Sequence, residues 1–340
     1  MTPPTPLRPA LDRAVGVHAP GRLHLGFLDP SGSLGRRFGS LGLVIDGVET
    51  ALTLRAAARQ QVEVAVPDAD GAAADADRAA SYLATLQRAT GCDTPLQLRL
   101  LSLLPAHAGF GSGTQLALAV GRAFAQLHGL DLTTRQIAQL LGRGLRSGVG
   151  IAGFDQGGLL LDGGPSEDGR PAPLLSRVEL PADWRVLLIL DPLRQGLSGG
   201  DEKSAIAALP RFAQADAAAI CHEVLMRVLP GAATGDFASF AAGVSRVQQL
   251  VGSHFAPAQA GRVYASAAVE RVCDWIAQQV ETGIGQSSWG PTGFAFLPSA
   301  EAAEALAARA RAAGIVDPAL RLQVAAPRAT GALVTSQPAR

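Results

Sequence analysis

The sequence lacks the features that mark several large classes of protein. Its three cysteines, Cys92, Cys221 and Cys273, are far apart and form no Cys-x-x-Cys pair, so neither a disulfide framework nor a zinc knuckle is indicated. No window approaches the roughly 18 unbroken apolar residues of a membrane-spanning helix. The first nine residues contain several prolines and no apolar segment typical of a secretion signal. We therefore expect a cytoplasmic protein with reduced thiols and no membrane partner.

An excess of positive charge is also missing. Lysine plus arginine and aspartate plus glutamate are both 29, so no long-range positive field is available to hold nucleic acid or an anionic membrane. This balance favours small-molecule partners. Lysine itself is almost absent, with Lys203 the single one. Any other cation that binds an anion here is therefore an arginine, whose planar guanidinium suits bidentate contacts with phosphate or carboxylate.

Apolar residues make up 48% of the 340 positions, enough for a large core in two domains or one two-lobed unit. Strand-like patterns dominate the first half, and helical spacing dominates the second, which predicts an α+β fold. The strand-like runs of the first half are residues 15–19, 23–28, 41–45, 50–56, 61–66 and 96–104. We place domains at residues 1–180 and 181–327, followed by a tail, residues 328–340, that we expect to be partly disordered.

A glycine-rich loop, residues 105–114, lies between a predicted strand and a predicted helix, residues 115–127. Its glycines can adopt positive φ and let backbone amides converge on an anion, and the helix start adds free N–H groups. Its hydroxyls can contact phosphate oxygens or Mg²⁺. The residues concerned are Gly109, Gly111, Ser112, Gly113 and Thr114. Alternatively, the loop is simply a tight turn from strand to helix.

The loop is not a Walker A loop, because no Gly-Lys-Ser/Thr occurs. It does not fit the Gly-x-Gly-x-x-Gly pattern that follows an early strand in dinucleotide-binding proteins, and it resembles another family motif. Pro105, Gly109, Gly111 and Ser112 match the Pro-x-x-x-Gly-x-Gly-Ser-Ser-Ala motif of the GHMP kinase superfamily, whereas the next two residues, Gly-Thr, depart from it. Four segments look like a non-kinase branch, the β-ribofuranosylaminobenzene 5′-phosphate synthases. They are residues 20–27, 109–115, 143–158 and the most specific, Gly-Gln-Ser-Ser-Trp-Gly-Pro-Thr at 285–292.

That resemblance implies a lobe like ribosomal protein S5 domain 2, a ferredoxin-like lobe, and an active site between them. It implies transfer of phosphoribose from phosphoribosyl pyrophosphate to 4-aminobenzoate or 4-hydroxybenzoate, with loss of carbon dioxide and pyrophosphate. The product would be a C-riboside 5′-phosphate for tetrahydromethanopterin biosynthesis. The resemblance also implies Mg²⁺ and a homodimer.

Cationic residues near the motifs are candidates for binding the phosphates. Arg22 and His24 lie two apart on a predicted strand and share a face, so they could bind a phosphate or the benzoate carboxylate. Alternatively, they are an exposed arginine and a hydrogen-bonded histidine. Arg143 and Arg146 are expected near the end of a helix, residues 133–143, beside a glycine turn that could form a further anion nest.

The resemblance also suggests catalytic and acceptor-binding residues. Asp155, near the place of the kinases' catalytic aspartate, would stabilise the ribose cation or hold Mg²⁺ together with Thr114; alternatively, it is a solvated turn aspartate. Ser112 is the second catalytic candidate. Trp289 offers a flat face for the benzoate, unless it covers the core. Its polar partners would be His24, Gln286, Ser287, Ser288 and Thr292.

Residues 194–203 follow a buried strand and could form a mobile flap over the site, or a solvated helix cap. Two other functions stay open on the sequence alone. An ATP-dependent small-molecule kinase could use the same cleft, and a catalytically inactive metabolite-binding protein would need only the fold.

Overall fold

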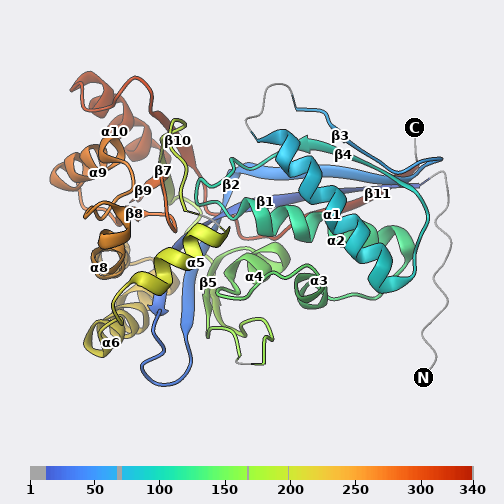
Figure 1. Cartoon of the computed structure of the whole chain (residues 1–340). Coiled ribbons are helices and arrows are strands. Elements are labelled where there is room, and N and C mark those ends of the chain that lie inside the picture. The colour runs from blue at the N-terminus through green and yellow to red at the C-terminus, as the bar shows by residue number, and fades with distance from the viewer. Residues whose placement is uncertain (1–12, 67–70, 167, 198, 339–340) are drawn as a thin grey trace.

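The computed structural model describes residues 13–66, 71–166, 168–197 and 199–338. The chain forms two halves that lie side by side, each built of one β-sheet and its own helices, which confirms the α+β class (Figure 1). One seven-stranded sheet has the order β11-β1-β2-β4-β3, with β5 paired to β2 and β6 to β5. Its strands are β1 (Arg13–Asp29), β2 (Phe38–Ala56), β3 (Gln61–Val64), β4 (Leu96–Ser102), β5 (Leu159–Asp162), β6 (Leu174–Val178) and β11 (Leu333–Pro338).

Strand β1 is one long strand where the sequence predicted two runs, because the chain passes through Pro20 without leaving the sheet. Its pairing with β2 shifts between Pro20 and Arg22 and again between His24 and Gly26. Such irregularities redirect side chains. The short segment between them places Leu23 in the core and lets its two polar neighbours face a pocket.

Helix α2 is the central helix of this half. Glycines in the left-handed conformation bound it, Gly111 before its first residue and Gly129 after its last. Most of its residues are buried against β1, β2 and α1, so its N-terminus is held at a fixed point above the sheet. The helices here are α1 (Ala72–Thr90), α2 (Ser112–His128), α3 (Thr134–Leu140), which begins with a capping box at Thr133 and Gln136, and α4 (Val149–Gln156).

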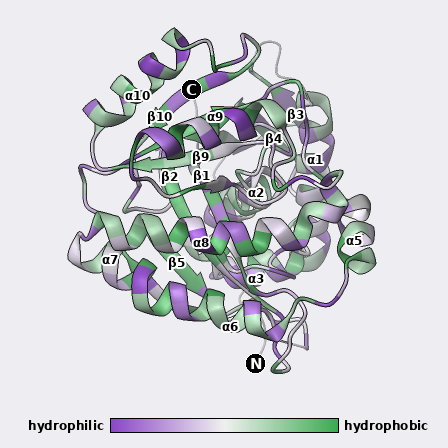
Figure 2. Cartoon of the chain, turned by 90° about the vertical axis from the view of Figure 1, so that its left-hand side faces the viewer, coloured by the Kyte–Doolittle hydropathy of each residue, from purple (hydrophilic) through white to green (hydrophobic). Residues whose placement is uncertain are grey.

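The second half is built on a four-stranded sheet of order β10-β7-β9-β8. Helix α8 crosses one face of this sheet. Hydrophobic and hydrophilic residues alternate along the helix, as expected when one of its sides is buried (Figure 2). The strands are β7 (Arg185–Leu190), β8 (Ile284–Gln286), β9 (Gly293–Leu297) and β10 (Arg321–Ala325). The helices are α5 (Gly199–Ala208), α6 (Gln214–Glu223), α7 (Leu229–Thr234), α8 (Phe237–Phe255), α9 (Ala267–Gln279) and α10 (Ala300–Ala312), with a π-helical turn at Val224–Val228 and a 3₁₀ turn at Ala256–Gln259.

The two halves share a hydrophobic cluster to which β1, β2, β7, β9, α6 and α8 all contribute. This shared core fixes how the loops at the junction face one another. The chain crosses from the first sheet to the second between Val178 and Arg185.

The expected disorder of the tail 328–340 is wrong for the part that the structure describes. Residues Leu333–Pro338 form β11, which pairs antiparallel with β1 from His18 back to Arg13. The polar composition of this strand hides its role, because it is an edge strand with little buried surface. Within the described residues, no helix is both long and apolar enough to cross a bilayer.

Candidate active site

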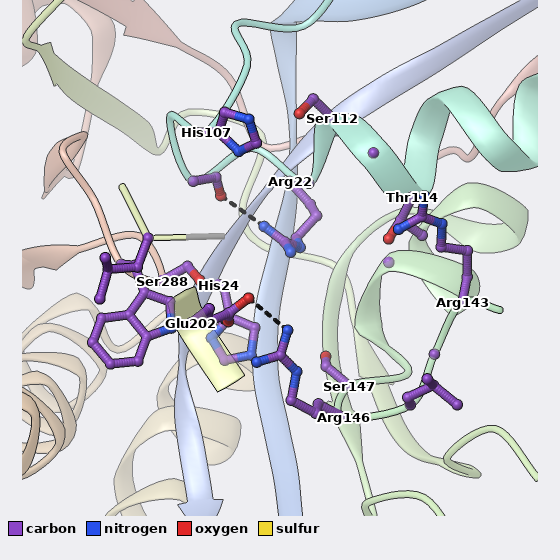
Figure 3. A pocket seen from close by; sticks show the side chains of 18 of the residues that line it. Arg22, His24, His107, Ser112, Thr114, Arg143, Arg146, Ser147, Glu202 and Ser288 are labelled. Atoms are coloured by element: carbon purple, nitrogen blue, oxygen red, sulfur yellow. Dashed lines mark hydrogen bonds and ion pairs between the residues drawn. The ribbon is translucent and has the colours of Figure 1, made fainter. Parts of the chain in front are cut away.

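A pocket of about 550 Å³ opens at the junction of the two halves (Figure 3). Its wall combines β1, the glycine loop, the start of α2, the turn after α3, helix α5 and the loop after β8. Ser112 and Trp289, taken from the two most informative sequence motifs, both line it. The other predicted residues in its wall are Arg22, His24, Gly109, Gly111, Gly113, Thr114, Arg143, Arg146 and Ser288.

The glycine loop has its shape because side chains are absent at two positions. Gly109 and Gly111 have φ of 90° and 78°. A Cβ on Gly109 would lie 2.4 Å from the carbonyl oxygen of Ser287, so only glycine lets this loop touch the loop after β8. A Cβ on Gly111 would lie 3.0 Å from the Arg22 guanidinium carbon. The loop therefore brings both its partner loop and an arginine into contact with its backbone.

Gly113 differs from those two glycines. It lies in the first turn of α2 with ordinary helical φ, and a Cβ there would meet Nη1 of Arg143 at 3.6 Å and Nη1 of Arg78 at 3.7 Å. Two guanidinium groups therefore flank an open space at the helix N-terminus. Free N–H groups and the partial positive charge of a helix N-terminus favour an anion at the same place.

Four arginines line the pocket, and each keeps a buried nitrogen without a hydrogen-bond partner in the part of the chain that the structure describes. The nitrogens are Nε of Arg22, Arg78 and Arg143 and Nη1 of Arg146. One other nitrogen of each is held by the protein. Arg22 donates to the Gly109 carbonyl at 2.6 Å and Arg146 to Glu202 at 2.6 Å, while Arg78 pairs with Asp75 and Arg143 with the Tyr82 hydroxyl.

Unpaired buried donors cost stability, so their gathering in one pocket indicates an anionic ligand. Burial lowers the pKa of Arg22 to about 10, although the nearby Glu202 carboxylate opposes that shift. Arg22 is therefore still a cation near neutral pH. Burial, with the charges of Arg22 and Arg146, lowers the pKa of His24 to about 3. His24 is consequently a neutral imidazole.

The opposite side of the pocket is aromatic. The Trp289 indole is buried, packs against Phe255 with a centroid distance of 4.7 Å, and donates its Nε1 hydrogen to Glu202 at 2.9 Å. Phe27 packs edge-on against the His24 ring at 4.6 Å. A small adjoining cavity shares His24, Phe27, Ser288 and Trp289 with the main pocket. The pocket is thus polarised between a cationic end and an aromatic end.

Three predicted benzoate ligands do not line the main pocket. Ser287 joins the two halves instead, donating to the Gly109 carbonyl at 2.7 Å and accepting from the His24 amide at 2.9 Å. The Gln286 side chain donates to Gln259 and to the Ser288 carbonyl, and it accepts from the Ala265 amide. Thr292 is buried just before β9. These polar residues hold the loop that presents Trp289.

The structure also places Asp155 outside the residues that line this pocket, unlike the other catalytic candidate, Ser112. Asp155 lies at the exposed end of α4 and accepts a hydrogen bond from Thr134 at 2.5 Å. The other nearby aspartate, Asp162, is fully buried and accepts from the amides of Gly148, Val149 and Gly164. It supports the turn that carries Arg146 and is not a pocket residue.

The residues present do not fit a Mg²⁺ ion held by the protein alone. Thr114 lines the pocket but Asp155, its expected partner, does not. Among the described residues, no group of three or more histidine, cysteine, aspartate or glutamate side chains could hold a metal. Mg²⁺ prefers several oxygens, including one or two carboxylates. The expected Mg²⁺ therefore stays a prediction, and no step below depends on it.

Sequence reasoning missed Arg78, His107 and Glu202, which all line the pocket. His107 lies within the glycine-rich loop, residues 105–114, but it was not singled out there as a site residue. Arg78 was hidden in α1 and Glu202 in the segment 194–203, from which Leu197 also lines the pocket. That segment was expected to be either a mobile flap or a solvated helix cap, and from Gly199 onward it forms helix α5 beside the pocket; Ser198 lies outside the described residues.

Family models match both halves of the chain. Residues 77–162 match the GHMP kinases N terminal domain, and residues 228–316 match the GHMP kinases C terminal domain. These two ranges contain the α2 N-terminus, the turn with Arg143 and Arg146, and the Trp289 loop. The GHMP kinase fold expected from the glycine motif is thereby confirmed.

Similar proteins of known name fall into two groups. The β-ribofuranosylphenol 5′-phosphate synthases of Archaeoglobus fulgidus and Methanothermobacter thermautotrophicus are 34% and 30% identical to this chain. The alignments cover 83% and 81% of this chain and 88% and 86% of those proteins. Among solved structures, the Streptococcus pneumoniae phosphomevalonate kinase covers 92% of this chain and 99% of its own, with a TM-score of 0.67 and 12% identity. That likeness concerns the fold alone.

Proposed function

The chain belongs to the β-ribofuranosylphenol 5′-phosphate synthase family within the GHMP kinase superfamily, and from this premise we propose that it transfers phosphoribose from phosphoribosyl pyrophosphate to a 4-substituted benzoate. Pyrophosphate and carbon dioxide are released, and a C-riboside 5′-phosphate is formed. The product in the relatives' name is a phenol, which 4-hydroxybenzoate would yield and 4-aminobenzoate would not. We therefore propose 4-hydroxybenzoate as the acceptor.

One observation carries this proposal: the same pocket holds four arginines with unpaired buried nitrogens and a buried tryptophan, which Glu202 links to Arg146. A donor that carries both a 5′-phosphate and a pyrophosphate needs several cations. An aromatic acid needs a flat apolar surface close by. The pocket meets both needs at its two ends.

The cationic end suits the leaving group. When the bond between ribose and pyrophosphate breaks, negative charge grows on pyrophosphate and the ribose becomes an oxocarbenium-like cation. Arg78, Arg143 and the N-terminus of α2 would bind the departing pyrophosphate at Gly113, with the Ser112 hydroxyl as a further donor. Arg22 and Arg146 would bind the 5′-phosphate. Fixed donors of this kind stabilise developing charge without rearranging during the reaction.

The aromatic end positions the acceptor. The ring carbon that bears the carboxylate must come within about 3–3.5 Å of the anomeric carbon. Trp289 and Phe27 offer the surfaces against which the ring can lie, with Ser288 beside them. The buried indole of Trp289 would also help to keep water from the ribose cation, which water would otherwise hydrolyse. Orientation and exclusion of water are therefore the main contributions of this end.

The test uses the purified full-length chain with phosphoribosyl pyrophosphate and carboxyl-labelled 4-hydroxybenzoate. We expect labelled carbon dioxide and pyrophosphate to appear in equal amounts without ATP. ATP consumption with candidate alcohols, and no label release, would instead identify a kinase. Ligand binding without either reaction would identify a metabolite-binding protein. Parallel reactions with 4-aminobenzoate establish the acceptor preference.

A pair of variants links this activity to the pocket. Arg143→Met removes one guanidinium from the cationic end, and loss of a charge-assisted hydrogen bond of about 1.5–3 kcal/mol predicts a decrease of about 10- to 150-fold in kcat/KM for the donor. Arg122→Met is the matched control. Arg122 is half-buried but lies outside the pocket and is fully bonded to Leu132 and Thr134. Equal losses in both variants would count against the assigned site.

The kinase alternative has less support, because the synthases match at 30–34% identity over most of the chain. Cytoplasmic location, a homodimer, Mg²⁺ dependence and a place in tetrahydromethanopterin biosynthesis remain predictions.

A further inference from the structure

Glu202 is the one acidic side chain among the described residues that line the pocket. It comes from α5, and its carboxylate bridges the two halves of the site. Oε2 accepts a hydrogen bond from Arg146 at 2.6 Å, and Oε1 accepts one from Trp289 Nε1 at 2.9 Å. Its side chain is only 14% exposed. A carboxylate in an anion-binding pocket would oppose ligand binding, so its presence calls for a chemical reason.

The position of Glu202 supplies that reason. It is bonded to Trp289 at the aromatic end, and Figure 3 shows it beside His24 and across the pocket from Ser112 and Thr114. The other charged or titratable groups that line the pocket are Arg22, Arg78, Arg143, Arg146, His24 and His107, of which Arg146 is bonded to Glu202 directly. The arginines are cations, and His24 is a weak base because its pKa is lowered to about 3. Glu202 is therefore the one carboxylate among the described pocket residues that could accept a proton, and its bond to Trp289 places it at this end.

The acceptor's own geometry directs one of its groups toward this residue. The carbon that bears the carboxylate must face the ribose, so the para substituent points to the opposite end of the ring. From these positions we infer that the Glu202 carboxylate receives the proton of the acceptor's 4-hydroxyl group and later returns it. This inference rests on the proposed function. It makes Glu202 a catalytic residue, because its carboxylate would touch the substrate.

The proton transfer balances within the reaction. As the new carbon–carbon bond forms at the ribose, the bond to pyrophosphate breaks and its electron pair leaves with pyrophosphate. The hydroxyl proton passes to Glu202 while the ring becomes a dienone. The bond between the ring and the carboxylate then breaks, carbon dioxide leaves, and the electron pair restores the aromatic ring as a phenolate. Glu202 returns the proton to that phenolate, so no other reagent is needed.

The contacts of Glu202 are compatible with this role. A carboxylate has about four lone-pair positions, so two accepted hydrogen bonds leave room for a third. The ion pair with Arg146 holds the carboxylate in position beside the aromatic end. The same negative charge repels the carboxylate of a benzoate that enters the wrong way round. Glu202 would therefore also select the productive orientation.

The decisive variant is Glu202→Gln, which keeps the shape and one oxygen acceptor but cannot take the proton. Loss of a general base predicts a decrease of about 10²- to 10⁴-fold in kcat with 4-hydroxybenzoate near neutral pH. The rate should then rise about tenfold per pH unit toward the pKa of a phenol, about 10, because the substrate increasingly arrives as phenolate. Wild type should lack that slope. With 4-aminobenzoate, whose amino group need not lose a proton, the variant should show neither the slope nor the full loss.

Two controls separate this role from a structural one. Trp289→Phe removes one partner of the Glu202 carboxylate but keeps an aromatic ring, so it should not acquire the steep pH slope. Glu63→Gln alters another glutamate paired with an arginine, Arg99, outside the pocket, and it should behave like wild type. A Glu202→Gln variant that is equally weakened at every pH and with both acceptors, or that keeps its activity within about twofold, would overturn the inference.

The design distinguishes this inference from the function on which it rests. Label release by wild type with no pH slope in Glu202→Gln would overturn only the role of Glu202. No label release by wild type would overturn the proposed function and this inference together.

Discussion

The replacement of Gly113 by alanine tests the anion site in a way that should stabilise the protein while weakening its ligand binding. A Cβ at this position would lie at ordinary contact distance, 3.6 Å and 3.7 Å, from the two nearest guanidinium nitrogens. The backbone is helical, so alanine is compatible with it and should raise the free energy of unfolding by up to about 0.5–1 kcal/mol. The new methyl group nevertheless fills the space where a pyrophosphate oxygen would contact both arginines.

The expected loss of binding follows from that geometry. A methyl group between Arg78 and Arg143 would displace the anion, and loss of one charge-assisted hydrogen bond of about 1.5–3 kcal/mol would weaken binding about 10- to 150-fold. Pyrophosphate at 100 times its Kd stabilises a protein by about 2.7 kcal/mol. If alanine weakens binding 100-fold, the same concentration stabilises the variant by only about 0.4 kcal/mol.

The assay is equilibrium unfolding of wild type and Gly113→Ala, with and without pyrophosphate. Gly200→Ala is the control, because Gly200 is in the first turn of α5 and a Cβ there would meet no atom within 4 Å. That variant should keep the full response to pyrophosphate. An undiminished pyrophosphate response in Gly113→Ala would refute the placement of the anion against Gly113. A less stable Gly113→Ala protein would refute the reading of this space as open.

Three further predictions concern the two ends of the pocket and its buried histidine. Ser112→Ala should raise the KM for phosphoribosyl pyrophosphate and Trp289→Ala the KM for the benzoate; steady-state kinetics that show equal effects on both substrates would contradict this division. Burial lowers the pKa of His24 from 6.5 to about 3, so the folded protein disfavours the protonated imidazole. The stability that the neutral form contributes is therefore fully present above about pH 6.5. As pH falls toward 3, the free energy of unfolding should decrease by about 5 kcal/mol in all. Denaturant unfolding at several pH values should show this loss in wild type and a shallower one in His24→Asn. Pyrophosphate should still stabilise the protein after metal removal with EDTA, because its expected ligands are arginines and backbone amides, and calorimetry in EDTA that detects no binding would contradict this.

Local sequence was sufficient for the parts of the site that depend on the backbone. The glycines at 109 and 111 were expected to adopt positive φ, and they do. Arg22 and His24 were expected to share a face because alternate residues of a strand do, and both line the pocket. Ser112 and Trp289 were assigned to one site through a family motif, and the structure brings them to one cavity.

Residues whose position depends on packing between distant elements could not be found in this way. Arg78 and Glu202 look in sequence like ordinary charged residues of exposed helices, and only the placement of α1 and α5 brings them to the pocket. Asp155 was chosen because it lies near the place of the kinases' catalytic aspartate along the chain, and it does not line the pocket. The short helix α4 instead directs it toward Thr134.

The pairing of β11 with β1 affects both the synthesis of the protein and its truncation. Arg13 lies opposite Pro338, so the sheet that carries Arg22 and His24 is completed by a strand synthesised after the whole second half. A fragment that stops near residue 180 would leave the edge of β1 unpaired and prone to association with other chains. The first half can therefore acquire its complete sheet only once ribosomes have also produced the second.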